Sequence, residues 1–346
     1  MKLQEYLDKK LSEDEKQQVI TTVDEYFVAS QEKMRKHHRE WYLIDRFLDG
    51  DHWVVFNKLT NSIQSLPVSS GEIRRTINLA DTQIRSVKNF ITKNAVRMEV
   101  HPRGDVSKEK AEVGHDIAQY YYETCRLKMA QDDIVDEALK HFIGYFVIGL
   151  GDTNRDNIPD ITVAVRSSYD IYPSPESTDI TIEKCRYVFD TRSEYIDDIK
   201  DNKEYDLINK DTKFESETDT NVSEYKAKLD RDRETKQPQK SKDLDKITVK
   251  DLYFRYRDDT KWKVGQITAA GKQILKIKKL NTKDYPIVPY RTERKIDQLI
   301  SKPWVKNIIS PNKAADKMCS HIETYILRML NGKILMKENT TMSRFT

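Results

Sequence analysis

Three acidic residues spaced four apart, Asp152, Asp156 and Asp160, are the strongest candidates for metal chemistry in this sequence. They match positions 1, 5 and 9 of a calcium-binding loop, in which carboxylate and carbonyl oxygens surround the ion. Position 6 of such a loop is a glycine and position 12 a bidentate carboxylate, but Asn157 and Val163 stand there. We therefore interpret the acidic residues as turn formers. A metal-dependent nuclease that uses them is kept as an alternative function.

Glycines at Gly149 and Gly151 follow a strand-like segment, as at the start of a dinucleotide-binding fingerprint. The third glycine of that motif is missing, and a turn and a second strand follow in place of the helix that would bind the pyrophosphate. The dipeptides Gly271-Lys272 and Gly332-Lys333 lack the upstream glycine and the Ser or Thr of a phosphate-binding loop. The sequence therefore predicts no nucleotide cofactor and excludes a P-loop ATPase.

Histidines and cysteines are not grouped as metal-binding motifs require. His37 and His38 stand in the reverse of the zinc-protease order, and we interpret them as surface residues of a basic helix. The cysteines Cys125, Cys185 and Cys319 are far apart and odd in number, which argues against a disulfide framework and indicates a reducing compartment. No segment combines a nucleophile, a base and an oxyanion site. We expect no metal, no cofactor and no enzymatic activity.

The composition of the 346 residues is polar, with 37% hydrophobic and 34% charged residues and a mean hydropathy of −0.77. The net charge is only +3, so the sequence predicts no general electrostatic affinity for nucleic acid. The N-terminus is charged throughout and lacks the apolar core of a signal peptide. Since no segment approaches the roughly 20 apolar residues of a membrane helix, we expect a soluble protein that is made in the cytoplasm.

Local signals predict two capped helices in the first hundred residues. Ser12 and Glu15 have the spacing of a capping box, which predicts a long helix through about Phe47. Asn78 is well placed to cap a second helix, with Asp81 in its first turn favoured by the positive end of the helix dipole. Short strands are expected at 52–56 and 97–102, with a loop at 57–72.

Two further helices and several strands are expected after residue 107. Ser107 can cap a helix whose apolar stripe is Ala111, Gly114, Ala118, Tyr121, Tyr122 and Cys125. A core-facing pattern follows at 134–142, and alternation predicts a β-hairpin of 145–150 with 161–165. Strands are also predicted at 247–256, 261–267 and 273–278, before an extended crossing at 285–290. The expected fold class is α+β.

The last predicted element is a helix near the C-terminus. Ser310 is the expected N-cap, Pro311 the first helical residue, and Asn331-Gly332 the stop. Helical spacing gathers six residues into one apolar face: Ala315, Met318, Ile322, Tyr325, Ile326 and Met329. The cations Lys313, Lys317 and Arg328 are left for other faces.

The order of these segments resembles the N-terminal part of tailed-bacteriophage portal proteins. The resemblance covers most of residues 40 to 335, and it rests on order and spacing more than on any single motif. The segments that carry it are the aromatic helix end Trp41 to Leu48 with Gly50 and Trp53, Arg74-Arg75-Thr76-Ile77-Asn78 before a helix, Val96 to Pro102, the Ala111 to Tyr122 helix, the Gly144 to Gly151 strand, Ile171-Tyr172-Pro173, Tyr285-Pro286-Ile287-Val288-Pro289, and the Ser310 to Leu330 helix.

The resemblance implies a portal-like α+β fold in which a helix-rich wing with β-hairpins is followed by a long stem helix. The implied divisions are a helical arm at 1–40, the wing at 41–199, a charged insertion at 200–246 that is a solvated helix or a mobile segment, wing strands and the crossing at 247–300, the first stem helix at 301–332, and the start of a clip at 333–346. Portal proteins usually continue with the rest of the clip and a second stem helix, so we expect this chain to be a fragment or the ordered part of a longer protein.

The resemblance also implies a non-enzymatic subunit of a ring, of about twelve copies, that surrounds the DNA channel at one capsid vertex. Such rings serve genome packaging, retention and ejection and join head to tail. The implied partners are other copies of the chain, the capsid protein, the terminase motor, tail adaptor proteins and double-stranded DNA, without a membrane. The implied location is the virion, after assembly in the host cytoplasm.

Within this interpretation the C-terminal helix carries the candidate functional residues. As a hypothesis, Lys313, Lys317 and Arg328 lie near the channel wall. Neighbouring subunits would pack on the face made by Met318, Ile322, Tyr325 and Met329. Two further alternatives stay open: another virion scaffold, such as a tail adaptor, and a plain DNA-binding module, whose affinity would depend steeply on salt.

Overall fold

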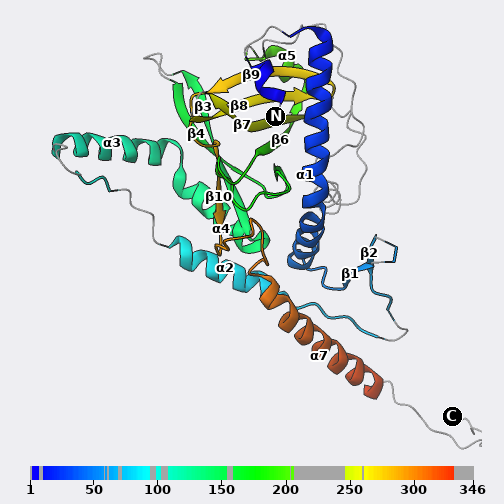
Figure 1. Cartoon of the computed structure of the whole chain (residues 1–346). Coiled ribbons are helices and arrows are strands. Elements are labelled where there is room, and N and C mark those ends of the chain that lie inside the picture. The colour runs from blue at the N-terminus through cyan, green and yellow to red at the C-terminus, as the bar shows by residue number, and fades with distance from the viewer. Residues whose placement is uncertain are drawn as a thin grey trace, which may run out of the picture.

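The computed structural model describes residues 2–7, 11–57, 59–60, 62–68, 72–93, 99–102, 108–153, 159–202, 204–205, 246–258 and 261–330. It is a mixed structure of helices and antiparallel sheets, which confirms the predicted α+β class. Figure 1 shows a body built on the sheets and helix α1, from which helices α3 and α7 project in different directions. A short 3-10 helix, η1 (Lys2–Tyr6), precedes α1.

Helix α1 (Glu13–Leu48) begins and ends as the sequence predicts. The Ser12 hydroxyl accepts a hydrogen bond from the Glu15 backbone at 3.4 Å, and the Glu15 carboxylate accepts one from the Ser12 backbone at 2.9 Å. This reciprocal box satisfies two backbone donors that the first turn leaves free. The helix then buries an apolar face that includes Val19, Val23 and Phe27 in the main core.

A five-stranded antiparallel sheet, in the order β5-β6-β7-β8-β9, packs against α1. Its strands are β5 (Ile171–Pro173), β6 (Tyr187–Tyr195), β7 (Lys246–Asp258), β8 (Lys261–Ala270) and β9 (Gln273–Leu280). The Phe27 ring of α1 meets the Phe189 ring of β6 edge to face at 5.3 Å. Gly271 lies in the β8–β9 turn with a φ of +53°, a conformation that favours glycine. The three strands predicted after residue 246 are therefore confirmed.

A second sheet, in the order β10-β3-β4, joins the predicted hairpin to the extended crossing. Strand β3 (Ile143–Thr153) pairs with β4 (Pro159–Arg166), and the crossing forms β10 (Ile287–Arg291) on the other edge of β3. Helices α2 (Leu79–Thr92) and α4 (Leu127–His141) form a second apolar cluster with the end of α1. The Asn78 side chain caps α2 by accepting from the Asp81 backbone at 3.2 Å, as predicted. A short helix, α5 (Ile196–Asp201), follows β6.

Three local predictions in this part of the fold are wrong, and one helix forms as predicted but with little of its apolar stripe buried. Residues 62–65 form strand β2 (Ser62–Ser65), paired with β1 (Val54–Asn57), inside the segment predicted as a loop. Residues 99–102 form no strand. Helix α3 (Lys108–Thr124) has the predicted extent, but only Ala111 of its apolar stripe is buried. His38 is buried against Trp41, Tyr169 and Tyr172, and is not a surface residue.

Several predictions concern residues outside the described part of the chain. These are the Ser107 cap, residues 97–98, the charged insertion from 206 to 245, and everything after residue 330, including the Asn331-Gly332 stop and the expected clip. Among the described helices, none is long and apolar enough to span a membrane. The domain boundaries proposed from the sequence stay a prediction.

Candidate functional site

Helix α7 (Lys306–Leu330) begins four residues before the predicted cap at Ser310, so Pro311 lies inside the helix. Backbone hydrogen bonds already form the turn before Ser310. For example, the Ile309 N–H donates to the Val305 carbonyl at 3.2 Å. Proline at position 311 leaves the Asn307 carbonyl without its helical donor. Both residues are exposed, so water can satisfy that carbonyl, and the proline is tolerated there.

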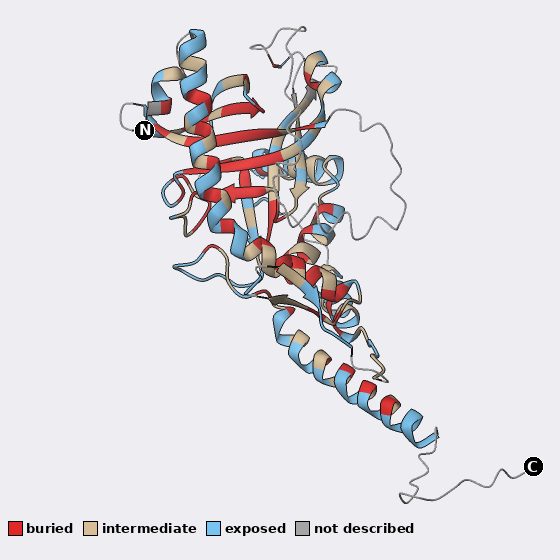
Figure 2. Cartoon of the chain, turned by 90° about the vertical axis from the view of Figure 1, so that its right-hand side faces the viewer, coloured by how far each residue is buried: buried red, intermediate tan, exposed pale blue. Residues whose placement is uncertain are grey.

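The buried face of α7 is polar. Asn312, Asp316, Ser320 and Thr324, which we call the polar ladder, are spaced four residues apart and are all buried. Residues four apart lie on one side of a helix, and Figure 2 shows these buried positions recurring along one side of α7. The sequence reasoning missed this face because polar residues at helical spacing also fit a solvated surface.

The polar ladder binds the backbone of the extended segment 72–80, which links β2 to α2. Thr324 accepts from the Ile73 N–H at 3.1 Å, and Ser320 accepts from the Arg75 N–H at 2.9 Å. Further along, Asp316 accepts from the Ile77 N–H at 2.8 Å and Asn312 from the Ala80 N–H at 2.9 Å. The segment and the helix therefore run antiparallel, and one side chain meets each backbone donor in turn.

The match between the helix and segment 72–80 follows from their repeat lengths. Four helical residues advance about 6 Å along the axis, and two extended residues advance about 6.6 Å. Alternate backbone N–H groups of an extended chain point to the same side, so the donors of Ile73, Arg75 and Ile77 each reach a ladder residue. The fourth donor, Ala80, is three residues further on and belongs to the first turn of α2. The ladder thus satisfies backbone donors of a segment that has no strand partner.

Asp316 is the centre of the polar ladder. Besides the Ile77 N–H, its carboxylate receives the Asn312 amide at 3.2 Å and lies 2.5 Å from the Nδ1 atom of buried His52. The His52 ring stacks on the Phe47 ring at 3.9 Å between centroids, close to the end of α1. Through this one carboxylate, α7 is connected to segment 72–80 and to the α1–β1 turn.

The other sides of α7 carry the residues singled out from the sequence. Met318, Ile322, Tyr325 and Met329 are 66%, 56%, 64% and 65% exposed, so the body of the chain does not cover them. They lie on the side of α7 away from the polar ladder, as helical spacing requires. A large apolar face left open on a projecting helix is a candidate for contact with another subunit.

The three predicted channel residues also lie outside the ladder. Lys317 and Arg328 are exposed, whereas Lys313 is half-buried with its ammonium 5.6 Å from the centre of the Phe47 ring. Burial, with the neighbouring charge of Lys317, lowers the pKa of Lys313. By helical spacing, the three cations form a stripe along one side of α7, between the polar ladder and the apolar face.

A buried charge cluster holds α1 to α4 within the body. The His141 Nε2 atom lies 3.1 Å from both Asp45 oxygens, and its Nδ1 atom lies 3.2 Å from Glu137. The Tyr169 hydroxyl donates to Asp45 at 2.8 Å. Burial opposes a charged imidazole, but the charges of Asp45 and Glu137 outweigh it and raise the pKa of His141 to about 10. Burial also opposes a charged Glu137, yet His141 lowers the pKa of that carboxyl to about 2.

We expect this cluster to limit the pH range of stability at both ends. Glu137 has an ordinary pKa of 4.5. Its contribution to the free energy of unfolding is therefore complete above pH 4.5 and is lost as the pH falls towards 2. His141 has an ordinary pKa of 6.5, so its contribution is complete below pH 6.5 and is lost as the pH rises towards 10. Urea unfolding across this range should show a plateau between the two limits. In the variant His141→Gln, the free energy of unfolding should no longer decrease as the pH rises from 6.5 towards 10. If it decreased as in the unmodified chain, the assignment would be contradicted.

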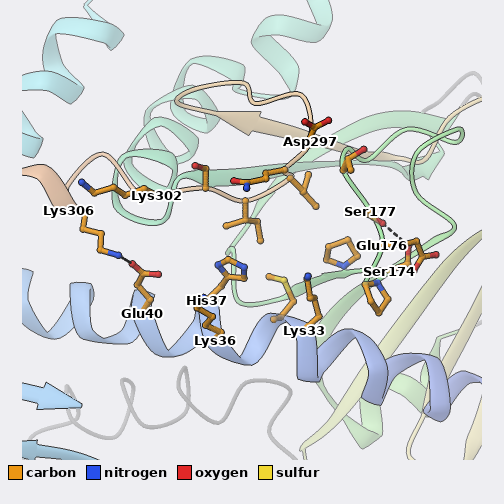
Figure 3. A pocket seen from close by; sticks show the side chains of 18 residues that line it. Lys33, Lys36, His37, Glu40, Ser174, Glu176, Ser177, Asp297, Lys302 and Lys306 are labelled. Atoms are coloured by element: carbon orange, nitrogen blue, oxygen red, sulfur yellow. Dashed lines mark hydrogen bonds and ion pairs between the residues drawn. The ribbon is translucent and has the colours of Figure 1, made fainter. Parts of the chain in front are cut away.

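A groove of about 520 Å³ lies between α1 and two loops of the body, at 173–178 and 297–302. Figure 3 shows lysines around it, with His37 pointing into it from α1. The Lys306 ammonium is paired with Glu40 across one end, and Ser174 is hydrogen-bonded to Ser177 at 2.6 Å at the other. The groove mixes cations, carboxylates, hydroxyls and apolar groups.

The metal site considered from the sequence is not assembled by the described residues. Asp156 and the side chain of Asp152 lie outside them, and no group of three potential metal ligands occurs among the side chains that the structure describes. Cys125 is near Asp160, but its thiol donates to the Ile161 carbonyl at 3.1 Å, and burial raises its pKa. The nuclease alternative therefore stays an untested prediction.

Comparison with known proteins identifies the family. None of the curated proteins compared with the chain matches it. A model of the phage P22-like portal protein family matches residues 24–342, which include most of α1, both large sheets and the whole of α7. The match covers most of the chain and agrees with the resemblance seen in the order of the segments. The chain therefore belongs to the P22-like phage portal protein family.

Proposed function

We propose that this chain is the structural subunit of a ring-shaped portal that surrounds the DNA channel at one capsid vertex. Membership of the portal family gives it a structural role in the virion, as part of the head-to-tail connector. The observation that supports the finer proposal is α7, a 25-residue helix that projects from the body and leaves an apolar face uncovered. A helix of this kind is suited to stand beside copies of itself around a central hole.

Each side of α7 then has a separate task. The polar ladder fixes the helix to its own chain, and the face of Met318, Ile322, Tyr325 and Met329 packs against neighbouring subunits. The stripe of Lys313, Lys317 and Arg328 lies close to the DNA. A small number of cations per subunit suits a channel, because many phosphate contacts would hold the DNA in place instead of letting it slide.

The proposal is tested by the shape and mass of the assembled protein. The full-length chain should form rings of about twelve copies with a central hole in negative-stain images, and mass photometry should give the corresponding mass. A tail adaptor or another virion scaffold would give a different stoichiometry or no hole. A stable monomer at micromolar concentration would contradict the proposal.

Charge reversal at Lys317 tests the channel assignment separately. We expect Lys317→Glu to leave the rings intact and to impair DNA retention, since the substitution brings like charges together around the channel. For rings that bind DNA in the channel, the slope of log affinity against log salt should fall by about 0.9 for each phosphate that the variant no longer binds. Retention is measured as the fraction of packaged DNA that resists nuclease. Unchanged retention and an unchanged salt slope would contradict the assignment.

The portal role also implies partners that the chain must meet during assembly. We propose the capsid protein around the vertex, the terminase motor during packaging, and tail adaptor proteins afterwards, with assembly in the host cytoplasm. The proposed role needs no cofactor and no catalytic residue. A purified ring that retains DNA without a bound metal or nucleotide would agree with this.

A further inference from the structure

Helix α3 projects from the body, and few of the residues that the structure describes pack against it. It has 17 residues, of which Ala111 alone is buried, whereas the 15-residue helix α4 buries six. An isolated helix of this length is only marginally stable in water, because most helical stability in proteins comes from packing of an apolar face. A neighbouring molecule that covers the exposed side of α3 would supply the packing that the described residues do not.

The uncovered side of α3 is amphipathic in a specific way. Val113, Ile117 and Tyr120 are 58%, 52% and 52% exposed and lie on one side of the helix, since they are four and three residues apart. The carboxylates Glu109 and Asp116 border that side. The opposite side of the helix faces residues 99–102, where Val100 approaches Gly114. The uncovered side is thus an apolar strip with an acidic edge.

A surface of complementary character lies across the molecule, in the groove beside α1. Its lining contains the partly exposed apolar residues Pro175 and Ile300, the cations Lys33, Lys36 and Lys302, the ion pair of Lys306 with Glu40, and the carboxylates Glu176 and Asp297. Figure 3 shows Lys33 and Lys36 on α1 and Lys302 on the facing loop, on either side of the groove. The acidic edge of an amphipathic helix can face these lysines, and its apolar side chains can contact Pro175 and Ile300 in the groove.

The positions of these two surfaces indicate the partner. In Figure 1, α3 and α1 lie on opposite sides of the body. A closed ring of more than two subunits is built from head-to-tail contacts, in which two different surfaces of each subunit meet. Resting on the ring proposed above, we infer that α3 of one subunit docks in the groove beside α1 of the next copy of this chain. Val113, Ile117 and Tyr120 enter the groove, and Glu109 and Asp116 face its lysines.

A charge swap in the full-length chain tests this pairing. The double variant Lys33→Glu/Lys36→Glu should weaken ring assembly about tenfold or more, because it places like charges opposite the acidic edge. Adding Glu109→Lys and Asp116→Lys should restore assembly. As matched changes on α3, Ile117→Asp should weaken assembly, whereas Gln119→Asp, which is exposed but lies outside the apolar strip, should not. Mass photometry against concentration gives the ring fraction.

A photo-crosslinking amino acid at position 117 makes the test independent of the effect of any variant on folding. In assembled rings it should yield a covalent dimer of the chain whose crosslinked peptides include 33–40, 173–178 or 297–302. Crosslinks confined to a single chain, crosslinks to a different protein, or rings unaffected by the charge reversal would overturn this inference while leaving the proposed ring intact. Failure of the unmodified chain to form rings would instead contradict the proposed function itself.

Discussion

Replacing Ile322 and Tyr325 by aspartate is expected to abolish ring assembly while leaving each subunit folded. Both side chains are more than half exposed in the single chain, so the body loses little packing when they change. In the proposed ring each of them is covered by a neighbouring subunit, and burying a large apolar side chain contributes about 1.5–3 kcal/mol. Without these two buried side chains, each interface is weaker by roughly two to four orders of magnitude. Sedimentation velocity at micromolar concentration should then show monomers.

The matched control for this experiment is Ser310→Asp. Ser310 is exposed on the same helix and lies outside the apolar face, so the same charge should leave the rings unchanged. Circular dichroism of both variants should match the unmodified chain. If the double aspartate variant still formed rings of normal mass, the apolar face of α7 would not be a subunit interface.

Removing the Asp316 carboxylate is expected to be the most destabilising single change on α7. The variant Asp316→Ala leaves the Ile77 N–H and the His52 ring without their buried acceptor, and each unsatisfied group of this kind costs about 1–3 kcal/mol. We therefore expect the free energy of unfolding to fall by about 3 kcal/mol or more. Urea unfolding measures the loss. Hydrogen exchange should show faster exchange at Ile73, Arg75 and Ile77, whose amides bind the ladder.

Glu323→Ala provides the comparison for Asp316. Glu323 also lies on α7 and pairs with Arg75 of the same segment at 3.1 Å, but this pair is partly exposed. An exposed ion pair contributes less than about 1 kcal/mol, so exchange at residues 73–77 should change little in this variant. Equal losses in the two variants would show that the buried carboxylate has no special role.

The parts of the fold that the sequence predicted are those with local causes. The capping box at Ser12, the Asn78 cap, the β3–β4 hairpin and strands β7 to β9 depend on residues a few positions apart, so a local pattern in the sequence predicts them. Strands β5 and β6 were not predicted. The apolar face of α7 was also found from helical spacing. The start of that helix was misplaced because Ser310-Pro311 is a common opening of helices, although residues 306–309 are already helical.

The parts that could not be predicted depend on residues distant in the sequence. The polar ladder joins segment 72–80 to residues 232 to 251 positions away, and nothing local distinguishes its side chains from solvated ones. The same holds for His141 and Asp45, which are 96 positions apart. A four-residue period of hydrogen-bonding side chains opposite an apolar face was the one available signal. It identifies a helix that is fixed on one side by polar groups and is open on the other.

The regular spacing of the ladder has a consequence for how α7 can move. Because its rungs bind backbone donors that every residue type except proline possesses, sliding the helix by one turn would still let Ser320, Asp316 and Asn312 accept from Ile73, Arg75 and Ile77. The amide bonds alone therefore specify the axial position of α7 only weakly. His52 distinguishes one axial position of α7 from the next, since Asp316 is the one described ladder residue to which it bonds. Replacing His52 by a residue that cannot bond Asp316 would thus remove one of the contacts that set the axial position of α7, beside the Lys306–Glu40 ion pair and the packing of Ile308 and Ile309.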